Sequence, residues 1–176
     1  NDWKIAGREI HLRLAGHRFD LRCQRPAKIE YMGWRSLEES IGMLATCDIN
    51  YLPQPFEAHL KPLAELSFPT KLTTYLAAGR PILLHAPAYA SLVKFNEMHG
   101  FGLWTDSLQS VELAGAIENL VMDKKLYREC SNAGQKVLRQ EFTEHQFRAA
   151  FHRFRDLKSS KFEFAADSTD RTVMKG

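Results

Sequence analysis

Short apolar runs alternate with helical stripes along most of this chain. The segment 8–16 places Ile10, Leu12 and Leu14 at every second position, which is the period of a strand with one buried face. The segment 80–86 is almost entirely apolar, as in a strand that is covered on both faces of a parallel sheet. With three similar segments, these runs predict five strands, at residues 8–16, 27–33, 48–53, 80–86 and 100–105.

Apolar residues recur at helical spacing between and after these strands. Ser36 with Glu39, and Thr143 with Gln146, have the spacing of a capping box at a helix start. Gly79 follows a short helical stretch, in the position of a left-handed helix end. The pattern predicts helices at residues 37–46, 72–78, 108–121 and 124–140, and a last helix from residue 143.

This order of elements predicts the fold class. Strands separated by helices favour an α/β fold with a doubly wound parallel sheet. Ligands of such folds bind where the carboxyl ends of the strands lead into helices. The periodicity ends near residue 157, so we expect one domain over residues 1–157 and a disordered tail over residues 158–176.

Composition and charge narrow the function classes. The formal net charge of +3 over 176 residues is too small to indicate nucleic-acid binding. The three cysteines are widely spaced, which favours neither a zinc site nor a disulfide framework, so no metal is expected. The sequence has no run long enough to span a bilayer, and we expect a cytoplasmic protein. Since the chain opens at Asn1 without an initiator methionine, we expect a piece of a longer protein.

The first candidate site lies in the stretch SFPTKLTTYLAAGRPILLH, residues 67–85. Pro69 suits the first turn of a helix, and Thr70 and Lys71 then stand where free backbone N–H groups attract an anion. This arrangement favours a phosphate-bearing ligand. The alternative is an ordinary helix start with a solvated surface lysine.

A second candidate follows the first long strand. Gly16 allows a sharp bend there, and His17 and Arg18 come directly after it. A bend beside a cation suits an oxyanion or a sugar hydroxyl. The alternative is a basic surface turn, because no G-x-G-x-x-G motif is present.

A third candidate, Gly33, Trp34 and Arg35, follows the next strand. Trp34 is suited to stacking on a planar ring, or equally to capping the core. The connection at residues 54–66 and His85 are weaker candidates, since scattered polar residues in a loop are usually solvated and a histidine after a buried strand is usually structural.

In their order along the chain, three segments resemble one family: YMGWRSLEESIGMLATCDINYLP, SFPTKLTTYLAAGRPILLHAP and SLVKFNEMHGFGLW. They are similar to the C-terminal, nucleotide-sugar-binding half of a GT-B glycosyltransferase, of the retaining family 4 type. The resemblance covers residues 9 to 157. It implies a Rossmann-like domain that binds a nucleoside diphosphate sugar as co-substrate, with no other cofactor. It also implies a partner domain from the same parent chain and a glycan, polysaccharide or lipid acceptor. Peripheral attachment at the inner face of the membrane stays open as an alternative to a cytoplasmic location.

The resemblance also implies residue roles. Thr70 and Lys71 would face the diphosphate or the donor sugar, which Gly16, His17 and Arg18 would also approach. Gly33, Trp34 and Arg35 would lie against the base. The family's catalytic residues are not assigned on this chain, and its diphosphate-neutralising Arg/Lys segment would precede Asn1.

The chain departs from the family pattern at the ribose site. The family commonly carries two glutamates spaced E-x7-E, and here these positions hold Leu66 and Thr74. Thr74 would offer the ribose only a hydroxyl contact. The leading hypothesis is therefore the donor-binding half of a hexosyltransferase, inactive in isolation. The alternatives are a non-catalytic nucleotide-sugar-binding or scaffold module, and a sugar-nucleotide epimerase of GT-B architecture.

Overall fold

The computed structural model describes residues 4–18, 28–153 and 155 of the chain. The chain divides into two compact units, Asn1–Leu138 and Arg139–Gly176. The first unit holds all the strands that the structure describes, and in the second unit residues 144–153 are helical. The boundary expected at residue 157 and the tail over 158–176 lie outside the described residues and stay predictions.

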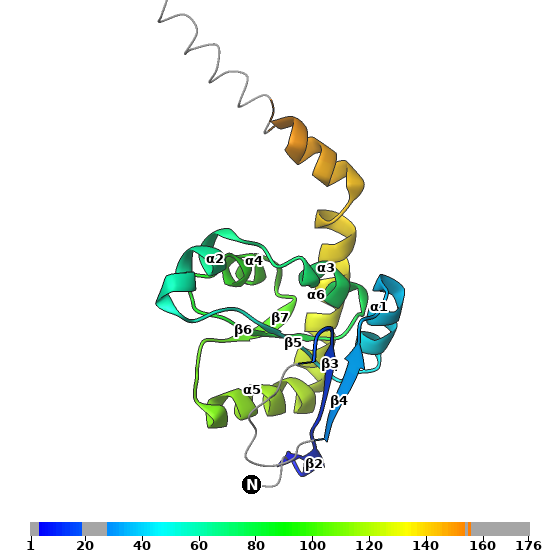
Figure 1. Ribbon diagram of the computed structural model, residues 1–176, viewed down its shortest axis with the longest axis vertical. Coiled ribbons are helices and arrows are strands. Elements are labelled where there is room, and N and C mark those ends of the chain that lie inside the picture. Colours follow the sequence, from blue (N-terminus) through cyan, green and yellow to red (C-terminus); the bar gives the residue numbers. More distant parts are fainter. Residues whose placement is uncertain (1–3, 19–27, 154, 156–176) are drawn as a thin grey trace, which may run out of the picture. The chain divides into compact units, whose positions relative to one another are not determined.

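A parallel three-stranded sheet forms the centre of the first unit (Figure 1). Its strands, in spatial order, are β5 (Asn50–Pro53), β6 (Ile82–His85) and β7 (Gly102–Thr105). All four residues of β6 are buried, because this strand has a neighbour on each side and helices over both faces. An almost wholly apolar run was expected to occupy such a position, and it does.

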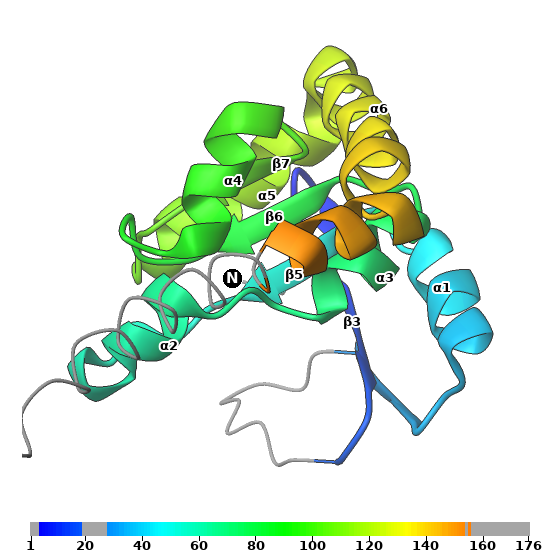
Figure 2. The same ribbon diagram turned by 90° about the horizontal axis from the view of Figure 1, so that it is seen from above.

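Helices cover both faces of this sheet (Figures 1 and 2). On one face Ala64 and Val93 pack together with Trp104 of β7. On the other face Leu120 and Cys130 pack against Leu83 of β6. The helical segments that follow β5 are η1 (Ala58–Leu60), α2 (Lys61–Leu66), α3 (Lys71–Ala77), α4 (Ser91–His99), α5 (Ser110–Met122) and α6 (Lys124–Glu141).

The strands β6 and β7 approach very closely at Gly102. A Cβ atom on Gly102 would lie 2.5 Å from the carbonyl oxygen of Ile82, so no side chain fits there. The Asn96 amide in α4 donates to the Gly102 carbonyl and accepts from the Gly102 N–H, both at 2.9 Å. The Trp104 indole N–H donates to the Ala86 carbonyl at 2.8 Å. These bonds fix β7 between β6 and α4.

A second, two-stranded parallel sheet precedes this one. It pairs β3 (His11–Ala15) with β4 (Lys28–Gly33), and α1 (Leu37–Ala45) then leads to β5. The single strand predicted over residues 8–16 is divided. Its first residues form β2 (Arg8–Glu9), which pairs with β1 (Lys4–Ile5) in an antiparallel hairpin, and the rest forms β3. The turn of the hairpin is made by Ala6 and Gly7, which both have positive φ, 50° and 75°.

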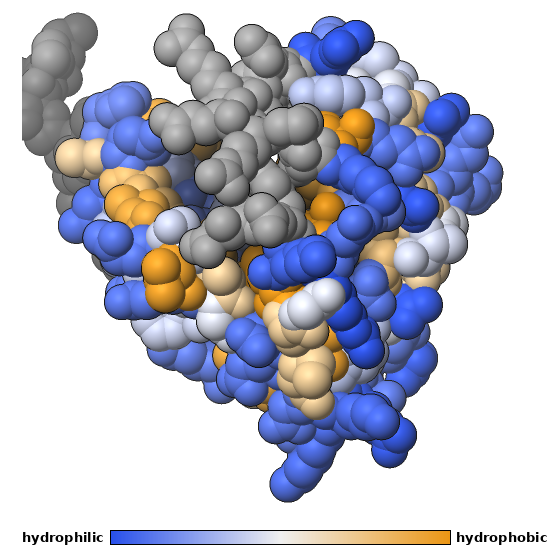
Figure 3. Space-filling model, turned by 90° about the horizontal axis from the view of Figure 1, so that it is seen from below, coloured by the Kyte–Doolittle hydropathy of each residue, from blue (hydrophilic) through white to orange (hydrophobic). Residues whose placement is uncertain are grey.

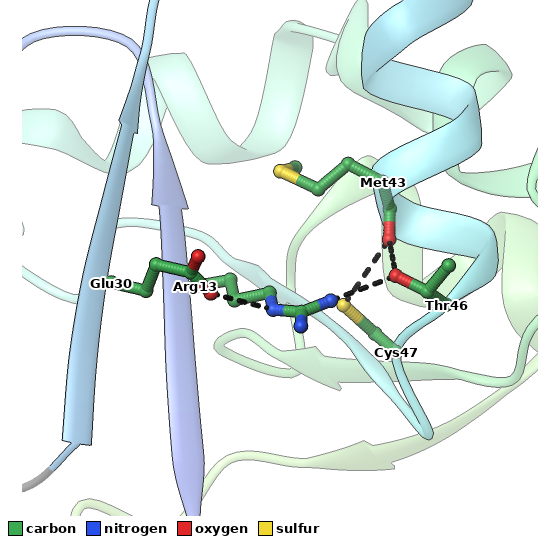
Figure 4. A network of polar contacts seen from close by, with 5 residues as sticks. All are labelled: Arg13, Glu30, Met43, Thr46 and Cys47. Atoms are coloured by element: carbon green, nitrogen blue, oxygen red, sulfur yellow. Dashed lines mark hydrogen bonds and ion pairs between the residues drawn. The ribbon is translucent and has the colours of Figure 1, made fainter.

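A polar network joins β3 to the end of α1 (Figure 4). The Arg13 guanidinium donates to the Glu30 carboxylate at 2.9 Å and to the Thr46 hydroxyl at 2.8 Å. The Thr46 hydroxyl donates in turn to the Met43 carbonyl at 2.7 Å, and the Cys47 thiol contacts the same carbonyl at 3.6 Å. The network holds the two-stranded sheet against the segment that enters β5.

Most elements predicted from the pattern are confirmed. The other four predicted strands and the helices at 37–46, 72–78, 108–121 and 124–140 occur within a few residues of their expected ends. Both bonds of the Ser36–Glu39 capping box are present, and Gly79 has the expected left-handed φ of 70°. The Thr143 hydroxyl accepts from the Gln146 N–H at 3.2 Å. The helices η1, α2 and α4 were not predicted.

Candidate functional site

Two glycine turns meet at the carboxyl ends of β3 and β4. Gly16 has a φ of 107° and Gly33 a φ of 67°, backbone angles that residues other than glycine rarely adopt. The Gly16 N–H donates to the Gly33 carbonyl at 2.8 Å. Each turn was predicted separately from the sequence, and the structure joins them through this bond.

Rings and a cation gather around the joined turns. The rings of His17 and Trp34 meet edge to face, with centroids 4.9 Å apart, and the Arg18 guanidinium lies 5.1 Å from the centroid of the Tyr31 ring. Trp34 is 73% exposed, so the alternative that it caps the core is wrong. An exposed indole with Arg35 next to it in the chain is suited to stacking on a planar, anionic ligand.

The helix α1 begins directly after this cluster. Ser36 caps it, accepting from the Glu39 N–H at 3.2 Å, while the Glu39 carboxylate accepts from the Ser36 N–H at 2.8 Å. The bond from the Ser36 backbone N–H, and after it a bond with the Ser36 hydroxyl, hold the pKa of the Glu39 carboxyl below its ordinary value, and nearby Arg35 lowers it further. The cap therefore fixes the direction in which the chain leaves Arg35.

The predicted phosphate residues lie at the start of α3. Thr70 is the N-cap residue but makes no capping bond through its side chain, and its carbonyl accepts from the Thr73 hydroxyl at 3.1 Å. Lys71 is exposed, and within the described residues its side chain makes no hydrogen bond or ion pair. Thr74, one turn further on, is half-buried. Since α3 has only seven residues, Lys71 rather than the helix dipole is the main positive charge here.

The predicted site residues thus form two groups, one at the glycine turns and one on α3. The helices that follow them are neighbours, because α1 packs against α3. In the described part of the chain, no hydrogen bond or ion pair joins the turn residues directly to Thr70, Lys71 or Thr74. The roles assigned to these residues stay predictions.

Sequence reasoning missed a hydrogen-bonded chain at the carboxyl end of β6, which joins buried His85 to exposed Tyr51. His85 is 9% exposed, and its Nε2 lies 2.9 Å from the Ser107 carbonyl oxygen. A carbonyl can only accept, so Nε2 carries the proton and Nδ1 accepts from the Tyr51 hydroxyl at 2.6 Å. Burial raises the pKa of Tyr51, and Phe56 packs on the imidazole with centroids 4.9 Å apart.

This chain of bonds supports the expectation that His85 is structural, since both of its ring nitrogens are used. The partner of His85 is Tyr51, which lies in the adjacent strand, two residues before Pro53. This tyrosine is the signal in the sequence that could have indicated the bond. Glu57 and His59, two polar residues of the connection at residues 54–66, are exposed in and beside η1. Among the described residues there is no cluster of three His, Cys, Asp or Glu side chains that could hold a metal. Nor does the described chain contain a helix long and apolar enough to cross a membrane.

Comparison with known proteins identifies the fold. No protein-family profile matches the chain, and no curated protein sequence matches it. Among solved structures, the chain is similar to Anabaena Alr3699/HepE in complex with UDP-glucose, at 18% identity and a TM-score of 0.52, over 65% of this chain and 28% of that one. It is also similar to HepE with UDP, and with UDP and glucose, each at 18% identity and a TM-score of 0.51, over 75% of this chain and 32% of that one.

The chain therefore spans less than a third of the HepE chain that it matches. At this identity the likeness concerns the fold. The predicted fold class, an α/β domain with a parallel sheet and helices that matches one part of a GT-B structure, is confirmed.

Proposed function

We propose that this chain is the donor-binding half of a GT-B glycosyltransferase of the family 4 type. The parent enzyme would transfer a hexose from a nucleoside diphosphate sugar to a glycan, polysaccharide or lipid acceptor. The observation that carries the proposal is the joined pair of glycine turns with exposed Trp34, in a fold shared with a protein solved with UDP-glucose.

Each group of candidate residues has a place in this proposal. Trp34 stacks on the base, with Arg35 beside it, and His17 and Arg18 approach the phosphates or the donor sugar. Thr70 and Lys71 bind the diphosphate, and the Thr74 hydroxyl contacts the ribose. Positive charge fixed near the leaving diphosphate would stabilise the charge that develops on it in the transition state.

The proposal needs a second domain. Because the chain matches less than a third of HepE, we infer that the acceptor is bound by another part of a longer parent chain. Transfer then requires both halves, so the chain alone binds a donor without turning it over. The nucleotide sugar is the co-substrate, and no further cofactor takes part.

Calorimetric titration with UDP, GDP, UDP-glucose and GDP-mannose tests the donor site. Losing a charge-assisted hydrogen bond costs about 1.5–3 kcal/mol, so Lys71→Ala should weaken nucleotide binding about 10- to 100-fold. Trp34→Ala should weaken it about 5- to 100-fold, the range for loss of one base–aromatic stack. Lys124→Ala, at the exposed start of α6, is the matched control and should bind as the unmodified chain does.

A donor-hydrolysis assay tests the second half of the proposal. Binding without turnover is the expected result, and appreciable hydrolysis by this chain would contradict the inference that both halves are needed. Absence of binding to all four ligands would favour the scaffold alternative. Equal binding by Trp34→Ala and the control would remove the glycine turns from the site.

A further inference from the structure

The two groups of candidate residues stand at corresponding ends of two neighbouring helices. The glycine-turn group, with Trp34 and Arg35, comes directly before the cap of α1. The α3 group, Thr70 and Lys71, stands at the start of α3. The helix α1 leads into β5 and α3 leads into β6, and these two strands are parallel neighbours. The far ends of both helices therefore lie beside the starts of β5 and β6, away from the candidate residues.

An arginine joins the far end of α1 to the turn after α3. The left-handed turn at Gly79 leads directly into Arg80. The Nε of Arg80 donates to the carbonyl of Ala45, the last residue of α1, at 2.7 Å. The helix dipole adds to this bond, because a cation is favoured at a helix C-terminus. The Nη1 of Arg80 donates to the Tyr127 hydroxyl at 3.2 Å.

The helix α6 passes beside α1 and α3 (Figures 1 and 2) and bonds to the ends of both. Its Tyr127 hydroxyl donates to the carbonyl of Asp48, in the segment between α1 and β5, at 3.0 Å. About two turns further along α6, the Gln135 amide donates to the carbonyl of Leu76, near the end of α3. One tyrosine hydroxyl thus links Arg80 to the chain that leaves α1, while the same helix anchors α3.

Apolar packing contributes less to the place of α1 than to that of α3. No residue of α1 is fully buried, and Leu37 is 63% exposed. On the right of Figure 3, the side on which α1 lies in Figure 1, the surface is mostly hydrophilic. By contrast, Leu72 and Leu76 of α3 are buried. The direction of α1 relative to α3 therefore depends more on the polar bonds at its end.

The glycine-turn group is bonded to α1 as one body. The two turns are joined through the Gly16 N–H and the Gly33 carbonyl. The Arg13 side chain of β3 also bonds to the hydroxyl of Thr46, the last cap residue of α1. A change in the direction of α1 therefore carries the glycine-turn group with it, whereas the α3 group stays with α3.

We propose that Arg80 and Tyr127 are positioning residues, which fix α1 against α3 and thereby set the spacing between Trp34 and Lys71. The nine residues of α1 place its start about 13 Å from Ala45, so a small tilt at the bonded end becomes a larger displacement at Trp34. A nucleotide with its base on Trp34 and its diphosphate at Lys71 needs one fixed spacing. This last consequence rests on the proposed function, whereas the geometric role does not.

Two variants loosen the bonded end of α1 with little change in charge or bulk. Tyr127→Phe removes the hydroxyl that bonds both Arg80 and the Asp48 carbonyl. Arg80→Lys replaces the planar fork, which donates from two nitrogens, by a single ammonium. The matched control is Arg128→Lys, one residue from Tyr127 on α6 and exposed. Urea melts confirm that each variant is folded before it is used.

NMR titration with three probes measures the spacing through its effect on binding. UDP would span both groups, uridine would meet only Trp34, and pyrophosphate would meet only Lys71. In both Tyr127→Phe and Arg80→Lys we expect UDP binding to weaken about 10-fold, a part of the advantage that two linked contacts have over one, with uridine and pyrophosphate binding unchanged within about 2-fold. Equal weakening of all three probes, or of none, overturns the proposal, because the spacing matters only to a ligand that spans it.

A ligand-free measurement separates this inference from the proposed function. Residual dipolar couplings of the backbone amides report the angle between α1 and α3 in solution. We expect this angle to change in both clamp-loosening variants and to stay the same in Arg128→Lys. An unchanged angle in Tyr127→Phe and Arg80→Lys overturns the proposal whether or not UDP binds. A changed angle in a chain that binds none of the three probes supports the positioning role and contradicts the proposed function.

Discussion

Replacing Gly102 with alanine should destabilise the sheet strongly, because the new methyl group has no room. The added Cβ would lie 2.5 Å from the Ile82 carbonyl oxygen, whereas ordinary contact begins at 3.4 Å. The gap must therefore open by 0.9 Å, the difference of these two values. Both sides are backbone and belong to the paired strands β6 and β7, so neither can turn aside as a flexible side chain would.

The cost of Gly102→Ala has two parts. Forcing a methyl group into a close-packed interior costs about 1–3 kcal/mol. The same shift stretches the two bonds between the Asn96 amide and the Gly102 backbone, each worth about 1 kcal/mol. We expect a loss of about 2–4 kcal/mol in the free energy of unfolding, a large share of the roughly 5–15 kcal/mol that holds a domain together.

Urea denaturation followed by circular dichroism measures this loss. The matched control is Gly115→Ala in α5, where the added Cβ meets no atom within 4 Å. That variant should gain about 0.5–1 kcal/mol, since alanine is a better helix former than glycine. The reasoning is refuted if Gly102→Ala unfolds within about 0.5 kcal/mol of the unmodified chain.

Three further substitutions test other contacts. Ser36→Ala removes the cap of α1 and should cost about 1 kcal/mol in urea melts. The pKa of Glu39 is lowered. The stability that its carboxylate adds to the cap is therefore present above the ordinary pKa of a glutamate and is lost as pH falls through the lowered pKa. The Ser36→Ala penalty should therefore shrink in acid, and a constant penalty would contradict this. Tyr51→Phe should cost about 1–3 kcal/mol at neutral pH by orphaning His85 Nδ1. Burial raises the pKa of Tyr51, so the stabilisation that its hydroxyl gives is present below pH 10 and is lost as pH rises through the raised pKa. In melts above pH 10, Tyr51→Phe should therefore lose less stability than the unmodified chain. Gly134→Ala places a Cβ 3.2 Å from a leucine methyl on α3; that methyl can move, and the helix gains propensity, so stability should change by less than about 1 kcal/mol.

The sequence predicted the strands well because burial on one or two faces leaves a simple apolar period. It predicted poorly where the structure depends on contacts between distant residues. The helix α4 was missed because its buried face includes Asn96, a polar residue whose partner is the backbone of Gly102. The hairpin of β1 and β2 was missed because its turn begins with Ala6 at positive φ, which glycine or asparagine would have indicated.

The same limit applies to the candidate site. Local signals were sufficient to find Gly16 and Gly33, because glycine at a strand end indicates a turn. The bond between them, and the edge-to-face contact of His17 with Trp34, depend on the register of β3 with β4, which no local pattern contains. The hydrogen bond between Tyr51 and His85 was missed for the same reason, since the two residues are 34 positions apart.

The surroundings of two tryptophans make them separate optical reporters. Trp104 is half-buried, packed against Val93, and its indole N–H is bonded to a carbonyl, so its fluorescence should shift to the red when the sheet unfolds. Trp34 is already 73% exposed and should respond little to unfolding but be quenched by a ring that stacks on it. Spectra of Trp34→Phe and Trp104→Phe would then separate the two responses, and one cuvette could follow ligand binding and folding at once.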